Sequence, residues 1–162
     1  KIFEVLGHFR KIKNLDLIHS VDAFMKLENE IFCAYSISKF EVGKRNDLSI
    51  NIFGDTGSLS WNHNKPEILI MHDQKGSMRL LDRNDSLLSV SQEKRYNRYT
   101  VGHPHGFIEA LSNVYYDIYH SIVSSQKEKY IKNLVSIEEE SLIFKALLSL
   151  QESCLKNRWI KN

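Results

Sequence analysis

The fold is decided by residues Phe40–Trp61, FEVGKRNDLSINIFGDTGSLSW. Every second side chain is apolar on both sides of a central turn: Leu48, Ile50 and Ile52 before it, Leu59 and Trp61 after it. The turn is Gly54-Asp55-Thr56-Gly57, in which the glycines permit a tight reversal of the chain. Two runs of period two joined by such a turn predict a β-hairpin.

The same alternation continues outward from this hairpin. Toward the N-terminus, Val21–Glu28 and Ile31–Ile37 are two alternating runs separated by a short polar break, and Ile2–Ile12 is a further expected strand. Toward the C-terminus, Glu67–His72 and Met78–Leu81 are expected strands. Serial strands with short connections imply a mostly antiparallel sheet.

The second half of the sequence predicts helices. From Gly106 the apolar residues recur in steps of four and three, as on one helical stripe: Phe107, Leu111, Val114, Ile118 and Ile122. A second helix is expected to begin at Ser136, because Glu139 completes a capping box with it. Between the two halves, Asp82–Tyr99 is polar and aperiodic, which predicts a long loop of a kind that is often functional.

These elements predict an α+β fold, with an open, mostly antiparallel β-sheet and helices packed on one of its faces. The other face would carry Tyr35 and Trp61. A broad exposed apolar face usually marks an interface, so we expect it to be available for dimerisation.

Length and charge narrow the class of protein. Residues 1–162 are expected to form a single domain. The net charge of +2 argues against nucleic acid as a partner, and the basic run Lys94–Arg98 is interpreted as a solvated surface. No apolar run approaches the roughly 18 residues that span a membrane. Cys33 and Cys154 lie in apolar stretches, and no signal peptide is visible, so we expect a reducing, cytoplasmic setting.

Three segments together resemble one family: Phe40–Trp61, the GHPHGFIEALSNVYYD run at Gly102–Asp117, and Asn157–Trp159. They are similar, in the same order, to the second domain of Gfo/Idh/MocA-type oxidoreductases, in which a Rossmann domain precedes an α+β domain. The resemblance implies a C-terminal substrate and dimerisation domain of an NAD(P)-dependent oxidoreductase that acts on a sugar, inositol or related polyol by hydride transfer. It also implies a homodimer or homotetramer formed through the open sheet face.

The Rossmann domain is not expected within this chain. The sequence holds no GxGxxG turn, so the resemblance implies that NAD or NADP is bound mainly by a missing N-terminal domain. Asn64 precedes Lys65-Pro66 where the family's catalytic motif has Glu-Lys-Pro, and Asp16–His19 is one residue short of its Asp-x-x-x-His motif. We therefore expect no complete catalytic set here and no activity from this fragment alone.

Lys44, Arg45 and Asn46 are candidate substrate-binding residues. They lie in a turn before the Leu48–Ile52 strand, where the resemblance places a run that contacts the polyol or sugar. A cation and an amide suit hydroxyl, carboxylate or phosphate groups. The alternative is a solvated polar turn.

His103 and His105 are the second candidate pair for substrate contact. Pro104 restrains the chain before Gly106, which frees it to begin a helix, and histidines at such a junction can donate to a ligand or move a proton. The alternative is helix capping and loop packing. A metal is not expected, because no third ligand has matching spacing.

Other motif residues favour structural roles. Packing is favoured for Asn113, Tyr116 and Asp117 on the Gly106 helix, and Asn157–Trp159 resembles the family's closing strand. For the whole chain, the alternative to an oxidoreductase domain is a non-catalytic binding or assembly module that works through its sheet.

Overall fold

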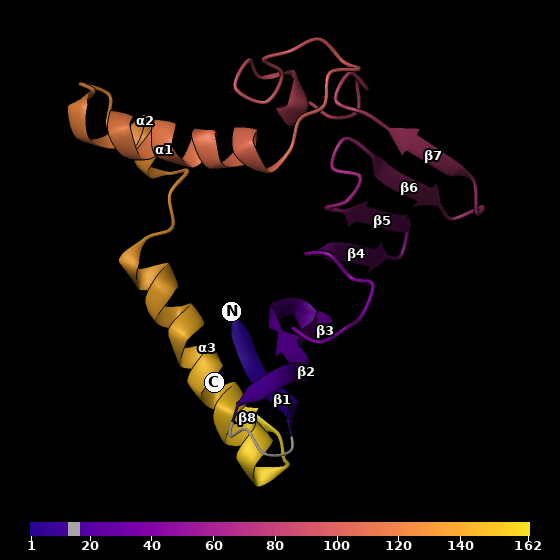
Figure 1. Ribbon diagram of the computed structural model, residues 1–162, viewed down its shortest axis with the longest axis vertical. Coiled ribbons are helices and arrows are strands. Elements are labelled where there is room, and N and C mark those ends of the chain that lie inside the picture. The colour runs from indigo at the N-terminus through magenta and orange to yellow at the C-terminus, as the bar shows by residue number, and fades with distance from the viewer. Residues whose placement is uncertain (13–16) are drawn as a thin grey trace. The chain divides into compact units, whose positions relative to one another are not determined.

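The computed structural model describes residues 1–12 and 17–162, so Asp16 lies outside the described residues. The chain divides into two compact units: Lys1–Gly43 with Val135–Asn162, here the first unit, and Lys44–Leu134, the second unit. Each unit holds one open, four-stranded antiparallel sheet (Figure 1). The predicted α+β class is confirmed, whereas the single-domain assignment stays a prediction.

The strands are grouped in two sheets where the sequence suggested one. The stretch of residues 39–48, between the strands of the first and second units, forms no strand. It turns through Gly43, at φ 90°, and Asn46, at φ 46°. Backbone in the left-handed region cannot continue an extended strand, so the first sheet ends before this stretch.

The first unit consists, in spatial order, of β3 (Phe32–Ser38), β2 (Ile18–Leu27), β1 (Ile2–Lys11) and β8 (Ile160–Lys161). Helix α3 (Ile137–Lys156) lies along β1 (Figure 1). A short 3-10 turn, η1 (Glu28–Glu30), connects β2 to β3.

The core of the first unit forms where α3 meets β1 and β2. Val5, Ala23 and Leu150 are its buried side chains. Gly7 permits this close approach, because a Cβ there would overlap Leu150 and lie 2.8 Å from Cys154 Sγ. The Gly7 amide also donates to Ser153 Oγ at 3.0 Å, which ties the strand to the helix.

Tyr35 lies on the face of this sheet that α3 covers, and the expectation that it belongs to a free face is wrong. It pairs in register with Ala23 and packs against the core. Burial raises the pKa of its phenol. The alternation of β3 was interpreted correctly, but alternation alone does not tell which face a helix will cover.

The residues next to each end of α3 explain where this helix begins and ends. The predicted capping box is confirmed: Glu139 N–H donates to Ser136 Oγ at 3.1 Å, and Ser136 N–H donates to the Glu139 carboxylate at 2.8 Å. Asn157, at φ 51°, ends the helix in the left-handed conformation. The closing strand is therefore Ile160–Lys161, three residues later than the Asn157–Trp159 segment expected to form it.

The second unit begins with β4 (Ser49–Gly54), β5 (Gly57–Asn62), β6 (Leu69–Asp73) and β7 (Met78–Leu81), which pair in chain order (Figure 1). Gly54 pairs with Gly57, which confirms the predicted hairpin. The 3-10 turn η2 (Val90–Gln92) lies in the polar loop, and α1 (Phe107–Val123) and α2 (Glu128–Ile131) contact each other.

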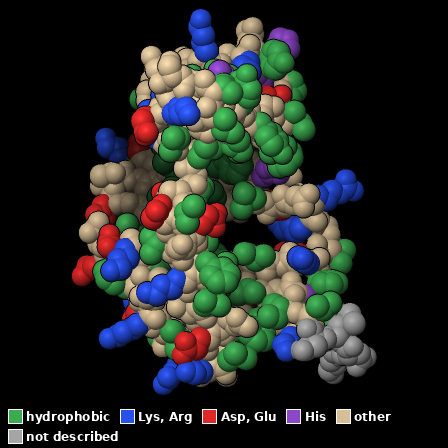
Figure 2. Space-filling view, turned by 90° about the vertical axis from the view of Figure 1, so that its left-hand side faces the viewer, with side chains coloured by type: hydrophobic (Ala, Val, Ile, Leu, Met, Phe, Trp, Pro, Cys, Tyr) green, Lys and Arg blue, Asp and Glu red, His purple; other side chains and the backbone are tan. Residues whose placement is uncertain are grey.

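Helix α1 has the predicted apolar stripe, but the stripe is not what the helix buries. The exposed fractions of its five side chains run from 39% at Leu111 to 66% at Ile122. The buried residues of α1 are instead Asn113 and Asp117. Figure 2 shows hydrophobic side chains gathered at the molecular surface.

Candidate functional site

Arg83, two residues beyond the end of β7, is the centre of a hydrogen-bond network in the second unit. Its Nε donates to Glu67 Oε2 at 2.6 Å, and its side chain is only 11% exposed. Its two terminal nitrogens donate to Asn97 Oδ1 and to the carbonyls of Tyr99 and His103 at 3.0–3.2 Å. One side chain thus ties the end of the sheet to the segment that leads into α1.

Glu67 holds the same segment from the other side. Its second carboxylate oxygen, Oε1, accepts the His105 backbone N–H at 3.0 Å. The His105 ring lies with Nε2 3.5 Å from Arg83 Nη1 and packs edge-on against Tyr99, with ring centroids 5.2 Å apart. The position of His105 is therefore set by contacts to its backbone and to its ring.

Helix α1 binds the polar loop through two arginines. Arg95 donates to both carboxylate oxygens of Asp117, at 3.1 and 2.6 Å, and Arg98 donates to Asn113 Oδ1 at 2.6 Å. Asn133 adds a third donor to Asp117 at 3.3 Å. These contacts correct the interpretation of Lys94–Arg98 as a solvated run, since two of its arginines are bound to buried partners.

The Arg95–Asp117 pair is electrostatically coupled. Hydrogen bonds from Arg95 hold the pKa of Asp117 below its ordinary value, although burial opposes that shift. The same hydrogen bonds raise the pKa of Arg95. Both shifts mean that the pair is charged across the physiological pH range.

A pocket of about 470 Å³, here the His105 pocket, lies between these groups. Trp61, Pro66, Phe107 and Val114 supply apolar walls. Its polar lining includes His63, Glu67, Arg83, His105, Glu109 and Asn113. Apolar walls with a few converging polar groups are typical of small-molecule sites.

Of the predicted residues, His105 lines this pocket. His103 does not, but its carbonyl binds Arg83 and its ring Nδ1 lies 3.1 Å from the Thr100 carbonyl oxygen. Lys44, Arg45 and Asn46 are also absent from the lining. Their loop nevertheless lies at the end of the sheet where this pocket is. Asp47, in the same loop, accepts a hydrogen bond from Lys44 at 2.6 Å and another from Asn62 at the end of β5.

Asn113 and Asp117 are buried, as the packing interpretation predicted, whereas Tyr116, the third residue of that interpretation, is exposed. Glu67 and Arg83 were not singled out from the sequence. Arg83 was signalled only by its place in the Asp82–Tyr99 loop, whose length marked it as functional. Glu67 carried no signal, because its partners lie far from it in sequence.

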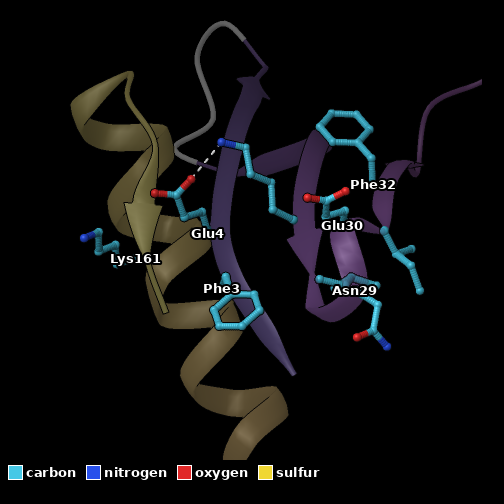
Figure 3. Close-up of a pocket in the computed structure, with 9 residues that line it drawn as sticks. Phe3, Glu4, Asn29, Glu30, Phe32 and Lys161 are labelled. Carbon is cyan, nitrogen blue, oxygen red and sulfur yellow. Dashed lines mark hydrogen bonds and ion pairs between the residues drawn. The ribbon is translucent and has the colours of Figure 1, made fainter.

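The first unit has a hollow of its own, of about 720 Å³ (Figure 3). Phe3, Leu27, Ile31 and Phe32 contribute apolar surface to it. Glu4, which is labelled in Figure 3, forms an ion pair with Lys26 at 2.8 Å. None of the predicted site residues lines this hollow, so the candidate site is the His105 pocket.

The described part of the chain holds no group of three or more His, Cys, Asp or Glu side chains suited to a metal ion. Among its helices, none combines the length and apolar character needed to cross a bilayer.

The sequence matches no protein-family model and no curated protein. Its fold matches solved structures over nearly its whole length. An oxidoreductase from Sinorhizobium meliloti has a TM-score of 0.86 at 20% identity, over 99% of this chain and 46% of that one. An inositol dehydrogenase homologue from Azotobacter vinelandii, complexed with NADH and myo-inositol, has a TM-score of 0.87 at 18% identity, over 100% and 44%.

A levoglucosan dehydrogenase in complex with NADH and levoglucosan matches with a TM-score of 0.65 at 13% identity, over 99% of this chain and 45% of that one. This chain thus spans less than half the length of the structures it matches. The predicted resemblance to oxidoreductases of the Gfo/Idh/MocA type is confirmed at the level of the fold, over a share of their length that fits their C-terminal domain alone.

Proposed function

We propose that this chain is the substrate-binding and oligomerisation domain of an NAD(P)-dependent oxidoreductase acting on a sugar, inositol or related polyol. The observation that carries the proposal is the fold match over the whole chain to an inositol dehydrogenase homologue complexed with NADH and myo-inositol. The His105 pocket supports it, since its volume suits a small polyol and its polar groups lie over apolar walls.

The described residues do not fit a dinucleotide. A pyrophosphate site needs a glycine-rich turn between a strand and a helix, whereas Gly54 and Gly57 close a hairpin between two strands. No chemical step of the cofactor is therefore assigned to this chain, and the proposal places the binding of NAD or NADP in a separate nucleotide-binding domain.

In this proposal the chain's own side chains hold and orient the polyol. If His105 Nε2 accepts from Arg83, Nδ1 carries the proton and can donate to a substrate oxygen. Arg45 and Asn46, at the same end of the sheet, would bind outer hydroxyl groups together with Lys44 and His103. The ring of His105 is fixed by Tyr99 and Arg83, so it would be oriented before the substrate arrives.

The test uses the gene product that carries this chain together with the nucleotide-binding domain that the proposal requires. Turnover of a panel of sugars, inositols and polyols is followed by the absorbance of the nicotinamide. Arg45→Ala should raise KM more than it lowers kcat, because it removes uniform binding, whereas His105→Ala should lower both kcat and kcat/KM. Lys75→Ala, an exposed lysine in the β6–β7 turn, is the control. Absence of turnover, or a His105→Ala variant with unchanged kinetics, would count against the proposal.

A second candidate, a non-catalytic assembly module, is favoured by one observation. Ile50 and Ile52 on β4 are 50% and 59% exposed, and their register partners Trp61 and Leu59 extend the same face across β5. Exposed apolar faces of this kind mark interfaces, here between copies of the chain as a homodimer or homotetramer. Ile52→Glu should lower the oligomeric state in sedimentation under both candidates. Only the oxidoreductase proposal also predicts turnover.

The cytoplasmic setting stays a prediction.

A further inference from the structure

The second unit has another pocket, also of about 470 Å³, with a different chemistry. Its lining includes five cationic side chains, Lys94, Arg95, Arg98, Lys129 and Lys132, and one carboxylate, Glu93. We call it the basic pocket. The whole chain carries a net charge of only +2, so this concentration of positive charge is local.

Most of this charge is not neutralised within the protein. Arg95 is paired with the Asp117 carboxylate, but Arg98 is bound by the neutral amide of Asn113. Lys94, Lys129 and Lys132 have no carboxylate within ion-pair distance among the described residues. Arg95 Nε is buried and has no acceptor in the described part of the chain. Like charges gathered in a hollow repel one another, and a bound anion would relieve that repulsion.

The same pocket has an aromatic wall, whose rings are held in place by contacts with His120. Tyr130 stacks on His120 with ring centroids 4.8 Å apart, and Tyr116 lies 4.3 Å from His120 and 5.9 Å from Tyr130. Tyr116 and Tyr130 both line the pocket, and Tyr116 is 45% exposed. Ring faces fixed in this way offer contact to the carbon body of a ligand at low cost in entropy.

We propose that the basic pocket binds a small phosphorylated molecule with a sugar or ring body. The phosphate is bound by Lys94, Lys129 and Lys132 together with the unused donors of Arg98. Several convergent cations suit a ligand with the double negative charge of a phosphate better than one with the single charge of a carboxylate. Tyr116 and Tyr130 contact the body of the ligand. The concave shape and limited volume favour a small molecule over a nucleic-acid strand. The site is separate from His105, and the inference stands without the proposed function.

Isothermal titration calorimetry on the 162-residue chain tests the inference with matched pairs of probes: glucose 6-phosphate against glucose, and AMP against adenosine. At least one phosphorylated probe should bind about tenfold or more tightly than its neutral partner, since the neutral partner lacks the charge-assisted hydrogen bonds to phosphate. Its affinity should fall as salt is raised. Failure of both phosphorylated probes to bind at millimolar concentration would overturn the inference.

Three variants locate the binding. Lys129→Gln combined with Lys132→Gln should weaken it by about tenfold or more, whereas Lys75→Gln and His105→Ala should leave it unchanged. Circular dichroism of each variant checks that it is folded. Unchanged binding by the double variant, or loss of binding in His105→Ala alone, overturns the assignment to this pocket. Tighter binding of a single-stranded oligonucleotide than of AMP would also overturn it, in favour of a nucleic-acid surface.

Discussion

Replacing Asp117 by Asn removes one charge from the most buried ion pair of the second unit and leaves the shape of the side chain unchanged. Asp117 is 2% exposed, and it accepts from both terminal nitrogens of Arg95. In the variant Arg95 keeps its charge but loses its counter-ion, while its own side chain is only 20% exposed. The amide also brings a donor to a place where three donors already converge, because Asn133 points at the same carboxylate.

The cost is set by the charge left behind. Removing one partner of a fully buried pair costs about 3–5 kcal/mol, and the partial exposure of Arg95 reduces this, so we expect about 2–3 kcal/mol. For a chain of this length that corresponds to a fall of roughly 4–12 °C in Tm. Glu152→Gln, which breaks the exposed Glu152–Lys156 pair, is the control and should leave Tm almost unchanged.

The pH dependence has a definite sign. Arg95 holds the pKa of Asp117 below its ordinary value of about 3.9. A group whose pKa is lower in the folded state adds stability above its unfolded pKa, and this stability is lost as the pH falls through the folded pKa. The advantage of the wild type over Asp117→Asn should therefore be constant from about pH 6 to 8 and shrink below about pH 4.

Urea denaturation followed by tryptophan fluorescence measures this directly. In a Trp159→Phe background the signal comes from Trp61, which lines the same pocket as Asp117. The reasoning is refuted if Asp117→Asn costs less than about 0.5 kcal/mol at pH 7, the size of an ordinary surface change. It is also refuted if the difference from wild type does not shrink in acid.

Three further changes test local features of the first unit. Glu30→Gly should stabilise the chain by about 1 kcal/mol in urea denaturation, because Asn29 and Glu30 lie at φ 59° and 60°, where Asn-Gly is favoured; a loss would contradict this. Gly7→Ala should lower stability by about 1–3 kcal/mol, since its methyl group would overlap Leu150; an unchanged Tm would show that α3 can move away. Ser136→Ala should cost about 1 kcal/mol in the same assay through loss of the cap, and Ser136→Asp should retain most of the stability.

Features with a local cause were predictable from the sequence. Met78–Leu81 is a strand with the bounds expected, Gly54 and Gly57 close the hairpin, and Ser136 caps its helix. Each depends on alternation, turn chemistry or capping within a few residues, so the pattern carries the whole signal. The closing strand was misplaced because Asn157 adopts the left-handed conformation and delays the next strand.

The lining of the candidate site was less predictable, because its contacts join residues far apart in sequence. Arg83 reaches Glu67 sixteen positions earlier and His103 twenty positions later, and no periodic signal marks such pairs. Helix α1 shows the same limit. Its apolar stripe was correctly located, but arginines of the preceding loop select the polar residues Asn113 and Asp117 as its buried side.

The polar loop is therefore better described as a bound segment than as a mobile one. Arg83 fixes its beginning to Glu67, and Arg95 and Arg98 fix its later part to α1. The residues between and beside these arginines supply walls to both pockets of the second unit: Tyr96 lines both, and Lys94 lines the basic pocket. Because the arginines hold the backbone of this loop, the loop side chains that line each pocket are positioned before any ligand binds. Loss of the Arg95–Asp117 pair should thus loosen both pockets together, which makes that pair the structural link between the proposed polyol site and the proposed phosphate site.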